Sequence, residues 1–368
     1  MESNQVNQKS QYLNEDLKGT NTSELEQLPL QLLRNINLKK LKDQVIVITG
    51  ASSGIGLVTA KMAASRGAKV VAAARNENAL KQLVEELTAK GYSATYVKAD
   101  VGREEDIKKI AETAISEFGR FDTWVNNAGI TIYGHAMDVS NEDIKRMFDT
   151  NFWGVVYGTK TAVKYFKDRG TPGSLINVGS LFGDRGTVIQ SAYAAAKFAV
   201  HGWTESVRME LEKENAPVSV TLIHPGRIDT PYNEHGRSYL DKQPAHRGMI
   251  YPPEAVAEAI LHSAENQKRD MYVGSQVKIL ELLGTLLPRF TDKLMEIIMY
   301  PTQHLNKPSK PLEESALYEA GYGLHERGTN QGWIRSNSMY VKASKYPMLT
   351  TMAITGIGLL TLMVAKRN

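Results

Sequence analysis

The chain is 368 residues long, with 42% hydrophobic and 23% charged residues, a composition that supports a sizeable globular core and excludes a fibrous or wholly disordered protein. Its formal net charge of +4 comes from 44 basic and 40 acidic residues with no dense basic block, so nucleic acid is not expected as a partner. Cysteine is absent, which excludes disulfides and thiolate metal sites.

Residues 1–40 are rich in Asn, Gln, Ser and Glu. We interpret them as a polar mobile arm that ends in a short amphipathic helix within LPLQLLRNINLKKL. The first residues lack the apolar core of a secretion signal, so we expect a cytoplasmic catalytic domain.

Residues 41–275 alternate short β-branched runs with longer amphipathic stretches. The runs predict strands at 45–49, 68–74, 93–99, 121–127, 173–180, 218–224 and 271–274. Intervening stretches such as 79–91 and 103–119 have helical periodicity and end at glycine. This alternation predicts an α/β domain with a doubly wound parallel sheet and helices on both faces.

The stretch TGASSGIG, from Thr49 to Gly56, follows the first predicted strand and precedes a helix expected to begin at about Ile55. Glycine tolerates positive φ and lets a ligand approach the main chain. Backbone N–H groups at such a helix N-terminus can bind a pyrophosphate, so we expect a dinucleotide site; a plain strand-to-helix turn is the alternative. The residues of this turn expected at the cofactor are Gly50, Ser52, Ser53, Gly54, Ile55 and Gly56.

Five further motifs follow in order: NNAG at 126–129, TNFWG at 150–154, NVGS at 177–180, YAAAK at 193–197 and HPGRIDT at 224–230. With the glycine spacing T-G-x-x-x-G-I-G, they resemble the short-chain dehydrogenase/reductase family over about residues 42–274. The resemblance implies a Rossmann-type fold, hydride transfer with a nicotinamide dinucleotide, no metal, and a homo-oligomer. It implies a catalytic set of Asn151, Ser180, Tyr193 and Lys197, with Lys197 also at the nicotinamide ribose and Asn151 positioning a water in a proton relay.

The residue types suit this chemistry. Tyr193 and Lys197 are four apart on a predicted helix, so their side chains share one face. A tyrosine releases its proton near pH 10, and a nearby ammonium favours the phenolate. Tyr193 would then donate a proton to a carbonyl oxygen or accept one from an alcohol, while Ser180 holds the same oxygen.

The cofactor type depends on the end of the second predicted strand, where an acidic residue would bind the ribose of NAD and an arginine the 2′-phosphate of NADP. Ala74 stands there and Arg75 follows, which favours NADP(H) and leaves NAD(H) open. The family pattern further implies cofactor contacts by Asp100, Val101, Asn127, Gly129, Ile228 and Thr230.

We expect the substrate to be a lipophilic or medium-sized carbonyl compound or alcohol, because the stretches that should build its pocket are mainly apolar. Two histidines, His201 and His224, have no evident carboxylate or metal partner in the sequence, and we interpret both as structural. The expected pocket residues are Ile130, Leu181, Phe182, Val188, Ile189 and Tyr232, beside Asp184 and Arg185.

The C-terminal region divides into three parts: a helical extension at 276–301, a polar linker at 302–346, and an apolar helix at 347–365. The run Met348–Ala365 is uncharged and would reach about 27 Å as a helix, close to the roughly 30 Å core of a bilayer. We therefore expect a membrane anchor; a helix docked on the catalytic domain or on a partner subunit is the alternative.

Two other functions remain open at this point. One is a different chemistry on the same fold, such as epimerisation or dehydration of a nucleotide sugar. The other is a non-enzymatic, nucleotide-binding protein associated with a membrane, which would not need an intact catalytic set.

Overall fold

The computed structural model describes residues 35–335 and 338–345. The chain divides into two units, residues 1–36 and 37–368, and almost all described residues belong to the second. Of the stretch 28–41, where an amphipathic helix was expected, residues 28–34 lie outside the described residues, and residues 35–40 form no helix before the short 3-10 turn η1 (Leu41–Asp43). The apolar helix expected at 347–365 also lies outside the described residues.

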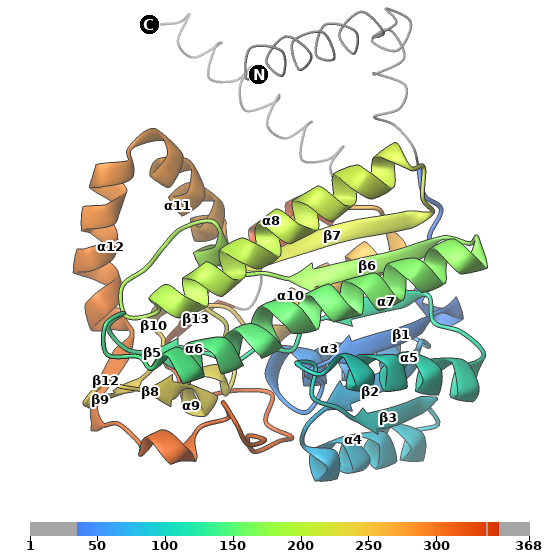
Figure 1. Cartoon of the computed structure of the whole chain (residues 1–368), viewed down its shortest axis with the longest axis horizontal. Helices are drawn as coiled ribbons and strands as arrows, with labels where there is room; N and C mark the ends of the chain where they lie inside the picture. Colours follow the sequence, from blue (N-terminus) through green and yellow to red (C-terminus); the bar gives the residue numbers. More distant parts are fainter. Residues whose placement is uncertain (1–34, 336–337, 346–368) are drawn as a thin grey trace, which may run out of the picture. The chain divides into compact units, whose positions relative to one another are not determined.

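Seven parallel strands form the central sheet in the order β11-β7-β6-β4-β1-β2-β3 (Figure 1). The order reverses between β1 and β4, which makes this the switch point of a doubly wound sheet. The predicted fold class is therefore confirmed. The strands are β1 (Val45–Thr49), β2 (Lys69–Ala74), β3 (Ala94–Lys98), β4 (Thr123–Asn126), β6 (Gly173–Val178), β7 (Val218–Pro225) and β11 (Asp270–Val273).

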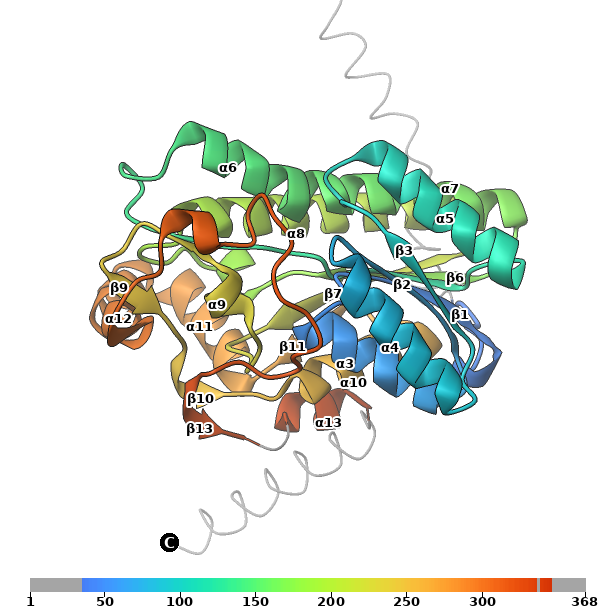
Figure 2. The ribbon, with the colours of Figure 1, turned by 90° about the horizontal axis from the view of Figure 1, so that it is seen from below.

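Helices cover both faces of the sheet (Figure 2). Ile46 and Ile48 of β1 pack in the core formed with α3 (Gly54–Ser65), α4 (Glu77–Ala89) and α10 (Pro253–Glu265). The alternate residues, Val45 and Val47, pack in the core formed with α5 (Glu104–Phe118), α7 (Gly154–Arg169) and α8 (Ser191–Lys213). Every residue of β1 is buried because both of its faces are covered, as expected of a parallel sheet.

Local signals at the helix ends agree with these bounds. The side chain of Asn76 accepts the N–H of Ala79 at 3.0 Å and so caps the start of α4. At the end of α5, Gly119 takes a left-handed conformation with φ 77°. Between α6 (Asn141–Phe148) and α7, the chain makes one π-helical turn, η2 (Asp149–Trp153).

Shorter elements gather at the carboxyl ends of the strands. The strand β5 pairs with β8, β9 with β12, and β10 with β13, while α11 and α12 lie side by side (Figure 1). The bounds are β5 (Ile132–Tyr133), η3 (Leu181–Gly183), α9 (Tyr232–His235), β8 (Arg237–Ser238), β9 (Lys242–Pro244), β10 (Arg247–Ile250), α11 (Ser275–Leu286), α12 (Pro288–Thr302), β12 (His304–Pro308), η4 (Leu312–Glu314), β13 (Gln331–Ile334) and α13 (Met339–Lys345).

The described part of 302–346 differs from the polar linker expected there. Its strands β12 and β13 pair with β9 and β10, and the buried residues Ala316 and Leu317 anchor the chain between them. Polarity suggested a tether, but backbone hydrogen bonds and polar side chains hold the segment, and neither depends on apolar residues. Within the described residues, no helix is long and apolar enough to cross a membrane.

Candidate active site

The glycine-rich turn links β1 to α3. Gly50 and Gly54 have φ angles of 68° and 52°, which favour glycine. A Cβ on Gly56 would lie 2.2 Å from the carbonyl oxygen of Gly50, so only glycine lets the first turn of α3 approach the strand end this closely. The predicted residues Gly50, Ser52, Ser53, Gly54 and Ile55 line a cavity above this turn, and Gly56 permits its close packing.

This cavity lies at the switch point of the sheet, and the space within and in front of it, open solvent included, is about 950 Å³. The ends of β2, β3 and β4 contribute the predicted residues Arg75, Asp100, Val101, Asn127 and Gly129 to its walls. Asn127 donates its side-chain N–H to the carbonyl oxygen of Thr49 at 2.9 Å, which ties the end of β4 to the glycine-rich turn. The bare main chain at the start of α3 and the groove across the strand ends suit the pyrophosphate and adenosine of a dinucleotide.

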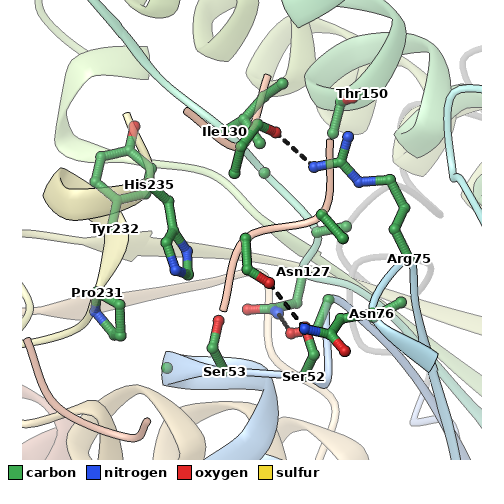
Figure 3. Close-up of a pocket in the computed structure, with 18 of the residues that line it drawn as sticks. Ser52, Ser53, Arg75, Asn76, Asn127, Ile130, Thr150, Pro231, Tyr232 and His235 are labelled. Carbon is green, nitrogen blue, oxygen red and sulfur yellow. Dashed lines mark hydrogen bonds between the residues drawn. The ribbon is translucent and has the colours of Figure 1, made fainter. Parts of the chain in front are cut away.

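The guanidinium of Arg75 is bound to a segment far along the chain. Its Nη2 donates to the carbonyl oxygen of Ala316 at 2.5 Å, and its Nη1 lies 3.3 Å and 3.2 Å from those of Leu317 and Tyr318. Figure 3 shows Arg75 on one side of the cavity, opposite Tyr232 and His235. The residue predicted to bind a 2′-phosphate thus lies at the cavity, but its described hydrogen bonds are to main-chain carbonyls.

We call residues 316–330 the C-terminal strap, because they cross the mouth of the glycine-rich turn. The strap pairs with that turn in both directions: the N–H of Leu324 donates to Ser52 O at 2.8 Å, and the N–H of Gly54 donates to His325 O at 2.9 Å. Sequence reasoning missed the strap, since it has neither strand nor helix periodicity and its contacts are made by the main chain and by polar side chains. Its residues Ala316, Ala320, Gly321 and Tyr322 line the cavity above the glycine-rich turn.

The predicted catalytic residues Ser180, Tyr193 and Lys197 come together in a second cavity. Tyr193 and Lys197 lie one turn apart on α8, and Ser180 follows β6 at the start of η3. The Nζ of Lys197 donates to the carbonyl oxygen of Val178 at 2.8 Å and lies 5.8 Å from the centre of the Tyr193 ring. All three predicted catalytic residues are buried.

Burial governs the protonation of this group. Burial raises the pKa of Tyr193, whereas hydrogen bonds with the hydroxyls of Tyr232 and Ser180 lower it in part. It also lowers the pKa of Lys197 to about 8, because its ammonium has left water. The ammonium of Lys197 therefore loses its proton nearer to neutral pH than that of an exposed lysine.

Asn151, the fourth predicted catalytic residue, lies in the π-helical turn η2. Its Nδ2 donates to the carbonyl oxygen of Ile130 at 2.8 Å, and its Oδ1 accepts the N–H of Ile130 at 2.9 Å. The side chain thus fixes the loop after β4, on which Gly129 borders both cavities. Extra turns of this kind are frequent at functional sites.

The second cavity adjoins the first, since Ile55, Asn127, Gly129, Thr230 and Tyr232 line both. Of the predicted substrate-pocket residues, Leu181, Phe182 and Tyr232 line it, Ile130 lines only the first cavity, and Val188, Ile189, Asp184 and Arg185 belong to neither lining. Ile228, predicted to contact the cofactor, also lines the second cavity. Two further residues of this lining, Met299 of α12 and His246, were not predicted.

Asp184 and Arg185, which were expected in this pocket, make their contacts outside it. Arg185 donates to the carbonyl oxygens of Gly284 and Pro288, at the ends of α11 and α12. Asp184 lies 3.0 Å from Nδ1 of His201 and 2.8 Å from Nδ1 of His224. The interpretation that both histidines lack a carboxylate partner is therefore wrong, because the fold brings the turn after β6 against α8 and β7.

Comparisons with known proteins show the family of the chain. The family model described as short chain dehydrogenase matches residues 44–240. The uncharacterized oxidoreductase YxnA of Bacillus subtilis is 71% identical over 343 residues, which are 93% of this chain and 96% of that protein. A CLA biosynthesis dehydrogenase/reductase of Lactiplantibacillus plantarum is 33% identical over 267 residues, 72% of this chain and 90% of that protein.

Among solved structures, a 3-ketoacyl-(acyl-carrier-protein) reductase from Brucella melitensis, complexed with NADH, is similar with a TM-score of 0.54 and 29% identity. The likeness covers 63% of this chain and 98% of that one. Sequence and fold both support an oxidoreductase that uses a nicotinamide cofactor. The chain belongs to the short-chain dehydrogenase family.

Proposed function

We propose that the protein interconverts a carbonyl compound and a secondary alcohol with NADP(H), with Tyr193 as the acid and base. The observation that carries the proposal is the meeting of Ser180, Tyr193 and Lys197 in one cavity that adjoins the dinucleotide cavity. A complete catalytic set of this kind argues against a purely structural nucleotide-binding protein. An epimerase or dehydratase would instead need a site for a nucleotide sugar beside the dinucleotide, and the glycine spacing of this chain differs from that branch.

The bound nicotinamide would supply or accept the hydride. In the reducing direction the hydroxyl of Ser180 holds the substrate oxygen, and Tyr193 donates its proton to that oxygen as negative charge develops there. The ammonium of Lys197 stabilises the phenolate left behind. Asn151, whose side chain donates to and accepts from the main chain of Ile130, contributes by fixing the loop after β4 and thereby the wall between the two cavities.

The preference for NADP(H) rests on Arg75. The end of β2 carries Ala74 and then Arg75, so no carboxylate stands there to repel a 2′-phosphate. In the described structure the guanidinium binds three neutral carbonyl oxygens, which are weaker acceptors than a phosphate dianion. We therefore propose that a 2′-phosphate takes up some of the Arg75 donors that now serve the strap.

The lining of the second cavity favours a lipophilic substrate. Leu181, Phe182, Tyr232 and Met299 surround the catalytic group, with His246 and Gln190 as polar neighbours. Two similar proteins carry names that include a 3-ketoacyl reductase and a CLA dehydrogenase/reductase, which supports 3-ketoacyl thioesters as a first class to test. We also propose a homo-oligomer, as is usual in the family, while membrane anchoring by Met348–Ala365 stays a prediction from the sequence.

A substrate panel with matched variants tests the proposal. Purified protein would be assayed by nucleotide absorbance with 3-ketoacyl thioesters, aliphatic ketones and secondary alcohols, each with NADP(H) and NAD(H). We expect turnover by the wild type and loss of most activity in Tyr193→Phe with NADPH affinity kept. Tyr165→Phe is the matched control, because it removes a hydroxyl from a ring stacked on Phe121, in the packing between α7 and the sheet. Full activity of Tyr193→Phe would disprove the assigned chemistry.

A further inference from the structure

A chain of buried polar side chains lies directly behind the active-site serine. The carboxylate of Asp184 bridges two imidazoles, with Oδ1 3.0 Å from Nδ1 of His201 and Oδ2 2.8 Å from Nδ1 of His224. The two rings lie 4.8 Å apart. At the far end, Nε2 of His224 lies 3.3 Å from Oδ1 of Asp270.

The near end of this chain reaches the main chain of Ser180. The backbone N–H of Ser180 points at Nε2 of His201, at 3.3 Å. An amide N–H can only donate, so Nε2 must be the bare, accepting nitrogen of the ring. The ring proton then sits on Nδ1, where it donates to Asp184. The hydrogen bonds at both ring nitrogens therefore require the same tautomer, which Asp184 stabilises by accepting the Nδ1 proton.

Electrostatics is consistent with that assignment. Burial lowers the pKa of His201, which keeps it neutral, and Lys197 acts in the same direction. Burial alone would raise the pKa of Asp184, but hydrogen bonds from both histidines hold it at about 2. His224 lies between two carboxylates and has a raised pKa despite its burial, with the ring of Tyr272 stacked on it and Arg208 beside Asp270.

The contact between His201 and the serine turn is close enough to transmit a displacement. A Cβ on Gly179 would lie 2.2 Å from Nε2 of His201, and a Cβ on Gly183 would lie 2.4 Å from it. The imidazole therefore packs directly against the main chain of the turn on both sides of Ser180, where only glycine leaves room for it. Within this turn, Ser180 Oγ accepts the N–H of Phe182 at 3.1 Å, which leaves its hydroxyl proton to point at a substrate oxygen.

We propose that His201 is a positioning residue for Ser180: oriented by Asp184, it accepts the Ser180 N–H through Nε2 and so fixes the hydroxyl that binds the substrate oxygen. This inference rests on the proposed function, in which Ser180 makes that contact. Asp184, His201 and His224 could also be arranged around a metal ion. In the hydrogen-bonded arrangement described, each Nδ1 donates to Asp184, so a metal bound at these nitrogens would have to replace both protons.

The tautomer can be measured without a substrate. Protein labelled with ¹⁵N-histidine would be examined by two-bond ¹H–¹⁵N correlation NMR from pH 6 to pH 9, and His201→Gln would assign the His201 signals by their loss. We expect His201 to be neutral with its proton on Nδ1 across this range. A proton on Nε2, or signals that change on addition of Zn²⁺ or Mn²⁺ as direct ligation requires, would overturn the proposal.

The effect on Ser180 is measured kinetically. His201→Phe keeps a flat ring without the acceptor, whereas the side-chain carbonyl of His201→Gln can still reach the Ser180 N–H. We expect His201→Phe to lower kcat for carbonyl reduction by about 10- to 100-fold with an unchanged Kd for NADPH, and His201→Gln to recover most of the loss. His262→Gln, on α10, is the matched control and should behave as wild type.

Each remaining result is decisive. Folded His201→Phe with wild-type kcat would overturn the proposal, as would a loss in His201→Gln equal to that in His201→Phe. If His201→Phe does not fold, the comparison of His201→Gln with wild type and the tautomer measurement decide. If the wild type reduces no carbonyl compound, the proposed function fails, while the tautomer measurement still tests the contact between His201 and Ser180.

Discussion

Replacing Arg75 tests how the dinucleotide is chosen. The guanidinium lies at the cavity wall, and its two terminal nitrogens make three hydrogen bonds to carbonyl oxygens of the strap. A hydrogen bond between a charged donor and a phosphate contributes about 1.5–3 kcal/mol, equivalent to about 10- to 160-fold in Kd. We expect Arg75→Ala to weaken NADPH by this factor and to change the Kd of NADH by less than about threefold.

Fluorescence titration or calorimetry with both nucleotides would measure these affinities, with Arg66→Ala as the control. Arg66 is an exposed arginine that pairs with Glu258 away from the cavity. The design separates two roles of Arg75, because both nucleotides share every feature except the 2′-phosphate. An equal loss for NADPH and NADH would show that Arg75 acts only by holding the strap, and an unchanged Kd for both would refute any role in binding.

Three further predictions concern Gly56, Lys197 and Asp122. Gly56→Ala places a methyl group against the Gly50 carbonyl, so it should abolish measurable dinucleotide binding and lower stability by about 1–3 kcal/mol, checked by titration and thermal unfolding. Because burial lowers the pKa of Lys197 to about 8, kcat/KM for carbonyl reduction should fall as pH rises through 8, and a rate still climbing at pH 9 would contradict this. Asp122 is buried and forms ion pairs with Lys39 and Arg169, so Asp122→Asn should lower the free energy of unfolding by about 3–5 kcal/mol. Chemical denaturation measures this, and a change under about 1 kcal/mol would contradict it.

Much of the fold follows from the sequence because its local signals are strong. The strands carry β-branched runs that are buried on both faces, so β1 and β2 could be placed within a residue or so. The glycine spacing also has a direct structural cause, namely the contact between Gly56 and Gly50. The spacing of Tyr193 and Lys197 places them on one face of α8, where the structure brings Ser180 to meet them.

Contacts made by the main chain or by distant side chains could not be predicted in this way. The strap binds Ser52 and Gly54 through its backbone, and such bonds leave no trace in residue type. The partnership of Asp184 with His224 joins residues 40 apart in sequence. Neither the periodicity nor the motifs of this chain carry information on which side chains will face one another across that separation.

The central claim is hydride transfer with proton donation by Tyr193, and isotope transfer tests it most directly. The enzyme would be given NADPH deuterated at C4 of the nicotinamide and the best ketone of the panel, and the alcohol would be analysed by mass spectrometry. We expect one deuterium on the carbinol carbon with the wild type, and no product with a Tyr193→Phe enzyme that still binds NADPH. Alcohol formed without deuterium from either face of the labelled nucleotide, or labelled alcohol made at the wild-type rate by Tyr193→Phe, would contradict the mechanism.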